Sequence, residues 1–422
     1  MKSVLVAALV TVAFSVSCTR ELPVVDPQIA ATIEGIKAID NHAHPVLAAG
    51  GDREFDALPV DSMEAQSDPV IYRAGAVKTP FTAASKAEAR QKYGDGYPAW
   101  VLDQIGVETM LANRVAMGAS VQPPRFRWVP YGDALIFPLD NSHLAAKNPD
   151  RKAFFALEDK LRARYLAEAV NEGGQAGRPV LQGLPASLAE YVARVVTPTL
   201  ERHKQGGALA EKFEAAYLRA LDFDPADPDQ AAKVYAAKTA SDADYKVLQD
   251  YLFRVVAAEC GRLGMAVHLH TAAGAGGYFD VAGSNPLHLE NLFNDPALRK
   301  TKFVMVHGGW PYTREMTPLL TKPNAYLDFS QQSLLVSPAT LAVTLREWLE
   351  VVPEKVMFAT DAYPYSGELG WEESGWLSAH NGREALGRAL TSMVRDGAIT
   401  RNRAAKLARM VLRENARGLY GI

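Results

Sequence analysis

The sequence predicts a (β/α)8 barrel that carries a helical insertion. Four short segments, taken in chain order, contain residues that bind metals, and in the last three an apolar β-type run leads into the polar residue. From residue 207 onward, strand and helix patterns also alternate regularly. Strands of such a barrel deliver functional side chains at their C-terminal ends. The four segments are Ala38–Pro45, Met265–Thr271, Lys302–Gly309 and Lys355–Asp361.

The length and composition suit one globular barrel with insertions. The chain has 422 residues, of which 48% are hydrophobic and 22% charged. Lysine and arginine total 45 and aspartate and glutamate 48, which gives a net charge of −3. Because no basic run interleaved with aromatic residues occurs either, there is no electrostatic case for nucleic-acid binding. We expect a small-molecule substrate instead.

Residues 1–18 predict an export signal. Lys2 supplies a positive start, and residues 4–16 are almost wholly apolar or small, in a run too short to span a bilayer comfortably. Cys18 resembles the lipidated cysteine of a bacterial lipoprotein, which predicts an exported protein, periplasmic or anchored to the membrane through Cys18. Plain secretory cleavage and an uncleaved anchor are the alternatives. Cys260 then has no disulfide partner, and its helical surroundings indicate a buried small hydrophobe.

Residues 19–30 are expected to form a linker and residues 31–422 the barrel domain. The irregular pattern from His44 to about residue 100 predicts a long insertion after the first strand. Strand patterns follow at 106–112 and 126–129, and residues 149–204 read as an inserted helical cap without a strand signal. We expect the insertion after the first strand to build pocket walls, and the insertions within 46–206, with the loop at 271–284, to determine specificity.

Beyond residue 206 the expected elements alternate cleanly. A strand at 207–213 precedes a helix from about Ser241 to Leu263, which Gly264 ends at a helix C′ position. The remaining elements are a strand ending at His270, a helix near 286–293, a strand leading to His307, a helix near 312–320, a strand at 325–329, a helix near 338–350, a strand leading to Asp361 and two further helical segments.

Paired histidines on two strands indicate a metal site. Residues i and i+2 of a strand share a face, so His42 and His44 are spaced to bind one divalent ion at the barrel mouth. Imidazole suits zinc, our first choice, and also iron, nickel or copper. A pair of surface histidines in a loop is the alternative. His268 and His270 repeat the spacing; we expect His270, nearer the strand end, to be a ligand and His268 to pack or support it.

Four further polar residues are candidates for catalysis and binding. His307 is expected to be a ligand of a second metal, or a proton donor and oxyanion stabiliser near the first. Asp361 is placed to accept a proton from metal-activated water, with a helix N-cap as the alternative. Lys212 could bridge two metals if carboxylated or bind a substrate carboxylate, and Arg219 could orient an anionic group; solvent exposure is the alternative for Lys212.

At these positions the sequence resembles the amidohydrolase superfamily, in particular the amidohydrolase-related (amidohydrolase 2) family. The matching motifs are DNHAHP at 40–45, KFEAAYLRAL at 212–221, HLHT at 268–271, NPLHLENLF at 285–293, FVMVHGGWPY at 303–312, PNAYLDFS at 323–330, FATDAYP at 358–364 and ENARGLYGI at 414–422. Residues 46–206 hardly match. The resemblance implies the barrel fold and divalent-metal chemistry, with His42, His44, His270 and Asp361 as ligands and His307 as a ligand or catalytic residue.

We therefore expect a metal-dependent hydrolase that cleaves a C–N or C–O bond, in an amide, a peptide-like substrate or a lactone, with metal-activated water. Asp361 would shuttle the proton, and His307 or the metal would polarise the carbonyl. One alternative is a metal-dependent non-oxidative decarboxylase, in which His307 or Asp361 protonates carbon. The other is a surface-anchored binding protein without turnover.

Overall fold

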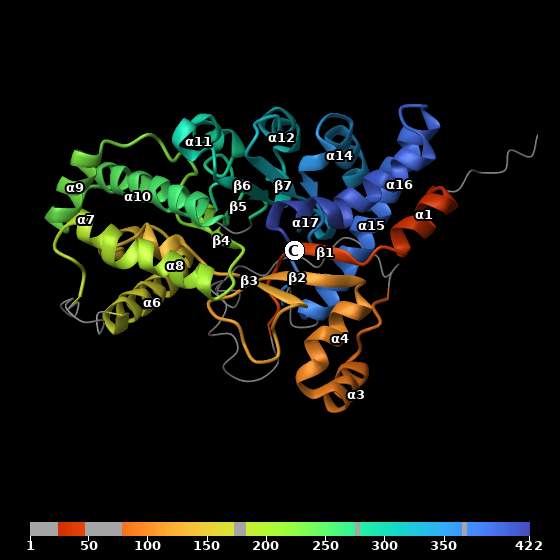
Figure 1. Ribbon diagram of the computed structural model, residues 1–422, viewed down its shortest axis with the longest axis horizontal. Coiled ribbons are helices and arrows are strands. Elements are labelled where there is room, and N and C mark those ends of the chain that lie inside the picture. The colour runs from red at the N-terminus through yellow and green to blue at the C-terminus, as the bar shows by residue number, and fades with distance from the viewer. Residues whose placement is uncertain (1–23, 47–77, 173–182, 275–278, 365–368) are drawn as a thin grey trace, which may run out of the picture.

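Eight short parallel strands form the centre of the computed structural model, which describes residues 24–46, 78–172, 183–274, 279–364 and 369–422 (Figure 1). The predicted Cys18 lipidation site and export signal lie outside these residues. The strands are β1 (Ala38–Ala43), β2 (Val107–Asn113), β3 (Phe126–Val129), β4 (Ala210–Phe213), β5 (Ala266–His270), β6 (Lys302–Val306), β7 (Ala325–Asp328) and β8 (Val356–Met357).

Hydrogen bonds at two seams close these strands into a barrel. Strands β1–β3 form one parallel sheet and β4–β8 another. At the β3–β4 seam, the amides of Leu209 and Lys212 donate to the carbonyls of Trp128 and Pro130 at 3.0 and 2.7 Å. At the β8–β1 seam, three further backbone hydrogen bonds join the two segments: Asn41 N to Phe358 O at 3.0 Å, Asp361 N to His42 O at 2.8 Å and His44 N to Ala362 O at 2.8 Å. The protein is thus a (β/α)8 barrel, as the sequence predicts.

Helices cover the outside of the barrel, as Figure 1 shows for α10, α11, α12 and α14 around β5–β7. The helices that follow β3 to β8 in order are α8 (Thr197–Gln205), α10 (Asp242–Leu263), α11 (Glu290–Asn294), α12 (Thr313–Leu320), α14 (Pro338–Val351), α15 (Trp371–Arg395), α16 (Arg401–Arg409) and α17 (Asn415–Tyr420). The loops between these elements contain further helices, namely α5 (Ser142–Ala145), α7 (Leu188–Tyr191), α9 (Pro228–Ala237) and α13 (Gln332–Leu335). Gly264 ends α10 with a φ of 66°, as its C′ placement predicts.

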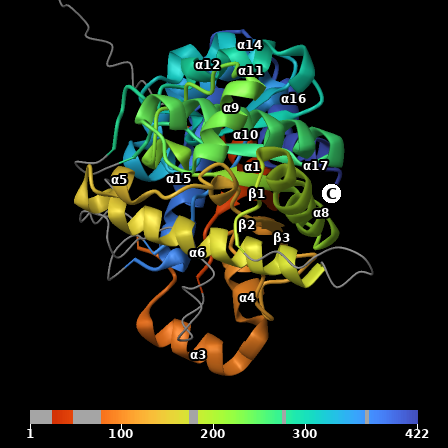
Figure 2. The ribbon, with the colours of Figure 1, turned by 90° about the vertical axis from the view of Figure 1, so that its left-hand side faces the viewer.

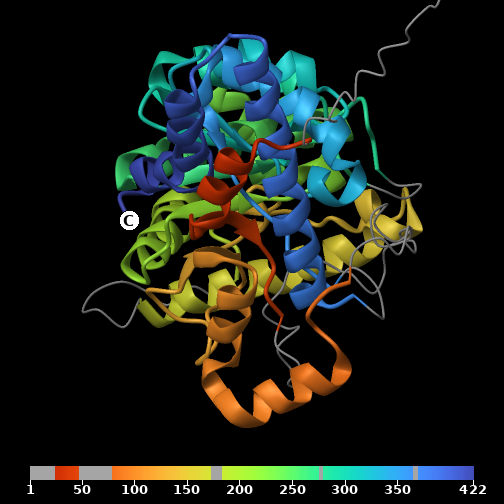
Figure 3. The ribbon, with the colours of Figure 1, turned by 90° about the vertical axis from the view of Figure 1, so that its right-hand side faces the viewer.

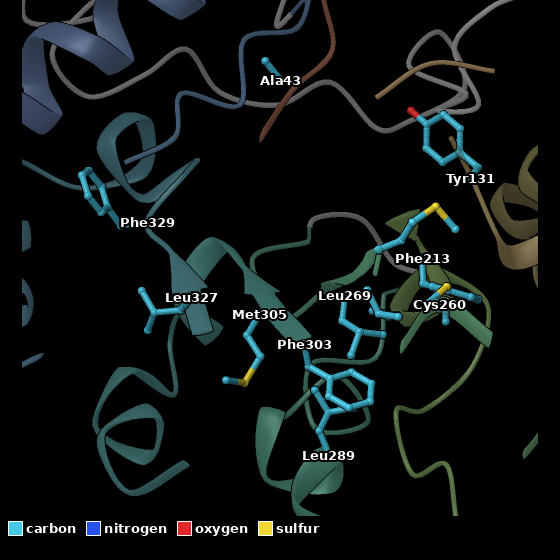
Figure 4. Packing of buried hydrophobic residues seen from close by; sticks show 14 of the residues in the cluster. Ala43, Tyr131, Phe213, Cys260, Leu269, Leu289, Phe303, Met305, Leu327 and Phe329 are labelled. Carbon is cyan, nitrogen blue, oxygen red and sulfur yellow. The ribbon is translucent and has the colours of Figure 1, made fainter. Parts of the chain in front are cut away.

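Side chains of alternating strand residues build two cores. Outward-facing residues pack against the helices: Figure 4 shows Leu269, Met305 and Leu327 at matching positions of three neighbouring strands, with Phe303 against Leu289. Inward-facing residues form a smaller apolar layer at the base of the barrel: Ile39, Leu111, Val129, Ala210, Ala266, Val304 and Met357. Because this base layer does not use the residues at the mouth, the barrel core is separate from the candidate site.

The described helix α1 (Pro27–Glu34) corrects the predicted linker at 19–30. The Asp26 side chain accepts from the backbone N–H of Gln28, and Pro27 occupies the first turn, so a helix starts at this point. Ile29 and Ile33 are buried, and Figure 3 shows α1 beside α15 and α16. Residues 27–30 therefore belong to the folded domain.

The insertions contribute helices that lie outside the barrel. Between β1 and β2 lie α3 (Ala83–Tyr93) and α4 (Tyr97–Gln104), and residues 47–77 of that insertion lie outside the described residues. The long helix α6 (Pro149–Glu172) crosses one side of the molecule in Figure 2. The Tyr165 hydroxyl on α6 donates to the Tyr131 carbonyl at 2.7 Å, so this helix is tied to the barrel near the candidate site. Among the described helices, none is long and apolar enough to cross a membrane.

Candidate metal centre

A β-bulge in β1 turns His42 and His44 toward the barrel mouth. Ile39 belongs to the interior base layer. Between Asp40 and Ala43 the strand advances three residues, whereas its partner β2 advances two, from Met110 to Ala112. Such an extra residue re-aims the side chains that follow it. Both imidazoles are buried, and their Nε2 atoms lie 3.3 Å apart.

Asp361 completes a triangle of donor atoms with the two histidines. Its Oδ1 atom lies 3.1 Å from His42 Nε2 and 3.7 Å from His44 Nε2. Ligands about 2.0–2.1 Å from a tetrahedral zinc ion lie roughly 3.3 Å from one another, so the three separations fit one such ion. A left-handed backbone with a φ of 53° aims Asp361 inward, the kind of strain that functional sites retain.

The Nδ1 atoms of the two histidines are held by neighbours, which turns Nε2 toward the triangle. The Asn113 side-chain amide contacts His42 Nδ1, and the Tyr131 hydroxyl lies 3.1 Å from His44 Nδ1. Support of this kind orients the imidazole ligands of metal sites. The donor chemistry and the spacing therefore both fit a divalent ion.

His270, His307 and Glu214 form the other half of the site. His307 Nε2 lies 3.1 Å from His270 Nδ1, which lies 3.3 Å from Glu214 Oε2. His307 also adopts a left-handed backbone, with a φ of 69°. Ligand atoms of His42, His307 and Asp361 lie within 4.8 Å of one another, so His307 is within reach of the triangle. His270 lies beside His307, with the two ring centroids 4.5 Å apart, and it is not one of the residues of the triangle.

Two buried atoms in this half can bind something else. His270 Nε2 has no hydrogen-bond partner among the described residues, and the contact of Glu214 Oε2 with His270 Nδ1 is a long one of 3.3 Å. Buried polar atoms are rarely left without a partner, because an unpaired atom in low dielectric is costly. A cation in this half of the site would satisfy both.

Glu214 is the main residue that the sequence reasoning missed. It lies two residues after Lys212, so both side chains share the inner face of the β4 path, and Lys212 Nζ contacts Glu214 Oε1 at 2.8 Å. Burial opposes ionisation of Glu214, but the Lys212 ammonium and His270 outweigh it and lower the pKa of Glu214. The signal in the sequence was the spacing of Lys212 and Glu214, which are two positions apart at the end of a predicted strand. Lys212 is fully buried, which excludes the solvent-exposed alternative.

Arg219 lies in a different environment from the histidines. Its guanidinium donates to Gln249 Oε1 at 3.0 Å and to Asp250 Oδ1 at 2.6 Å, both on α10. It lines a surface pocket with Phe137 and Tyr245. In the described contacts, the structure does not bring Arg219 to the donor triangle.

Aromatic rings form an apolar wall beside His270. The Tyr217 ring centroid lies 4.4 Å from that of His270, and the Phe279 centroid 6.0 Å away. Phe154 of α6 stacks on Tyr217 at 4.9 Å, so the helical insertion contributes to this wall.

Burial sets the protonation of the site. Burial and the Lys212 charge lower the pKa of His42 well below its usual value, and burial with His270 does the same for His307. Burial raises the pKa of Asp361 to about 7. The two imidazoles are therefore neutral near pH 7, as metal ligation requires, while the Asp361 carboxyl titrates there.

We predict that metal affinity rises with pH up to about 7 and then levels off. In the metal-free protein the Asp361 carboxyl, with its pKa raised by burial to about 7, holds a proton below that pH. An ion must displace this proton, so the association constant should fall about tenfold per pH unit below pH 7. Competition with a chromophoric chelator between about pH 5.5 and 8.5 measures it. The Asp361→Asn variant should lose the slope; equal affinity of the native protein at both ends would contradict the prediction.

Comparison with known proteins identifies the family. A family model described as amidohydrolase matches residues 143–422, more than half of the chain. This chain belongs to the amidohydrolase family. The predicted family is thus confirmed, although His42 and His44 precede the matched residues.

The amidohydrolase also has a curated relative and structural neighbours. Protein fluG of Emericella nidulans is 30% identical over 225 residues, which cover 50% of this chain but only 25% of that protein. A Lactobacillus casei protein described as a metal-dependent hydrolase superposes with a TM-score of 0.62 at 16% identity, covering 93% of this chain and 97% of that one. Uronate isomerase of Thermotoga maritima gives a TM-score of 0.57 at 12% identity, covering 94% and 98%. At these identities the neighbours support the fold alone.

Proposed function

We propose that this amidohydrolase is a metal-dependent hydrolase that cleaves a C–N or C–O bond of a small polar substrate, such as an amide, a peptide-like compound or a lactone. The observation that carries the proposal is the position of the Asp361 carboxylate. Its Oδ1 belongs to the donor triangle, and its Oδ2 lies 3.9 Å from His307 Nδ1. One carboxylate therefore adjoins both the ion-binding atoms and a second group that can handle a proton.

His42, His44 and Asp361 would hold the ion, with His307 and His270 on the adjoining side. Zinc suits this set of imidazole and carboxylate donors. When bound, such an ion lowers the pKa of water to about 7 and polarises a carbonyl.

The residues of the chain supply the proton transfers. Asp361 is assigned the transfer of a proton: its Oδ2 atom, which is not part of the donor triangle, would take a proton from water and return it to the leaving nitrogen or oxygen. His307 is a neutral imidazole between Asp361 and His270. Its Nε2 atom would accept a proton from a group of the substrate. Tyr217 and Phe279 would exclude water beside His270.

Product labelling tests the reaction type. We would incubate zinc-loaded protein with small amides, dipeptides, lactones and aromatic carboxylates in ¹⁸O-labelled water and follow the products by mass spectrometry. Hydrolysis predicts one ¹⁸O atom in the product carboxyl group, and chelator-treated protein serves as the control. Release of carbon dioxide without ¹⁸O incorporation would overturn hydrolysis and favour the decarboxylase. Retention of a compound without turnover would favour the binding protein.

A further inference from the structure

A chain of hydrogen bonds crosses the barrel interior from its base to His307. Helix α17 covers the base: Ala416 and Leu419 pack into the interior apolar layer, and Lys302 Nζ bonds the Leu419 carbonyl at 3.0 Å. The next residue, Tyr420, begins the chain. Its links are Tyr420 Oη to Asn41 Oδ1 at 2.5 Å, Asn41 Nδ2 to Asp328 Oδ2 at 2.7 Å, Ser330 Oγ to Asp328 Oδ1 at 2.5 Å, and Ser330 Oγ to His307 Nδ1 at 2.8 Å.

Asp328 sets the direction of every bond in this chain. Its Oδ1 atom already accepts the backbone N–H groups of His307 at 3.2 Å and Ser330 at 3.0 Å. Its Oδ2 atom faces the amide nitrogen of Asn41. Burial raises the pKa of Asp328, whereas these donors favour the ionised form. Since both oxygens face donors, the carboxylate is the acceptor at the centre of the chain.

On the base side, this direction determines the tautomer of His268. Because Asn41 turns its nitrogen to Asp328, its oxygen faces Tyr420, and the tyrosine hydroxyl must donate to it. The Tyr420 oxygen then accepts from His268 Nε2, which lies 2.6 Å away. His268 Nδ1 is buried and has no acceptor for a proton among the described residues, which agrees with the neutral Nε2–H form.

On the site side, the same logic determines the tautomer of His307. The Ser330 hydroxyl has one proton, which it donates to Asp328 Oδ1, so Ser330 Oγ must accept a hydrogen bond from His307 Nδ1. The Nε2 lone pair of His307 is then directed to the site. His270 Nδ1 lies 3.1 Å from this atom and 3.3 Å from Glu214 Oε2. A proton on His270 Nδ1 can be donated to the Glu214 carboxylate, so the His307 Nε2 lone pair stays available to the substrate and the unpartnered His270 Nε2 is a lone pair as well.

We propose that Tyr420 is a positioning residue for the candidate site, which acts through Asn41 and Asp328 to hold His307 with its proton on Nδ1 and its Nε2 lone pair toward the substrate. His268 and His307 lie at opposite ends of the chain and carry opposite tautomers. The effect on turnover rests on the proposed function, whereas the tautomers do not.

Histidine NMR tests the assignment without a substrate. Long-range ¹H–¹⁵N correlation spectra of the full chain, labelled at histidine nitrogen, distinguish Nδ1–H from Nε2–H imidazoles. Spectra of His307→Gln and His268→Gln identify the two residues. We expect Nδ1–H for His307 and Nε2–H for His268. An Nε2–H form at His307 would overturn the proposal, whatever reaction the protein catalyses.

Kinetics test the action of Tyr420 on the site. Tyr420→Phe keeps the ring and removes one hydroxyl, and we expect kcat to fall about tenfold with less than about a twofold change in KM. Tyr326→Phe is the matched control, since Tyr326 also packs at the barrel base and its hydroxyl does not belong to the hydrogen-bond chain. Adding Tyr420→Phe to Ser330→Ala should lower kcat no further, because both substitutions interrupt the same chain of hydrogen bonds. Equal effects of the two tyrosine variants, or fully additive effects with Ser330→Ala, would refute the positioning role.

Discussion

Replacing His42 with alanine is expected to remove the metal and lower turnover by more than about 100-fold, because loss of a residue that merely supports a ligand already costs 10–100-fold. His42 Nε2 is the donor closest to both of its triangle partners, at 3.3 Å from His44 Nε2 and 3.1 Å from Asp361 Oδ1. Metal content by elemental analysis and hydrolysis of the substrate found by screening are the two measurements.

The fold of the His42→Ala variant should survive. The apolar base layer of the barrel lies apart from the mouth, and only one imidazole is removed. His143→Ala, which alters an exposed histidine of α5, is the control for handling and metal loading. If His42→Ala loses its circular dichroism signal on metal loss while the control does not, the metal would be structural rather than catalytic.

Asp361→Asn is expected to lower turnover by roughly 10²–10⁴-fold, the range that general acid–base groups contribute. The amide keeps the size of the side chain and one oxygen, but it cannot take a proton at Oδ2. The loss should therefore appear in kcat. Metal content is measured on the same samples, so that weaker ion binding is separated from lost proton transfer.

The control for this prediction is Asp242→Asn, a change at an exposed carboxylate on α10 that pairs with Lys147. Turnover of Asp361→Asn within a few fold of the native value, with metal retained, would remove Asp361 from the proton transfers. The decarboxylase and its protonation of carbon through His307 would then become the stronger reading.

Most of the barrel could be predicted because each strand carries its own local signal. The runs before His270, His307 and Asp361 are apolar and β-type, and the structure has β5, β6 and β8 there. The strand at 207–213 is shorter than predicted, since β4 starts at Ala210. The linker predicted at 19–30 overlaps the start of α1, because the elements against which this helix packs, α15 and α16, are far away in sequence.

The candidate site was predictable in its residue types but not in its partnerships. The structure brings His42, His44 and Asp361 together and places His307 beside His270, yet the sequence cannot show which nitrogen of each imidazole faces which neighbour. Glu214 was missed because its role depends on Lys212 and His270, which meet it only across two strands. The bulge that turns His42 and the left-handed backbone at Asp361 depend on tertiary context as well.

The seam between β1 and β8 has a consequence for the order in which the chain is made. The backbone N–H of Thr360 donates to Asp40 Oδ1 at 2.9 Å, although the two residues are 320 positions apart. The donor triangle straddles the same seam. A growing chain therefore carries both histidines of the triangle long before it carries the aspartate. The complete set of donors exists only after the eighth strand has been synthesised and paired with the first. An ion that needs all three donors cannot serve as the nucleus on which the early strands gather; it can act only on a barrel that has already closed.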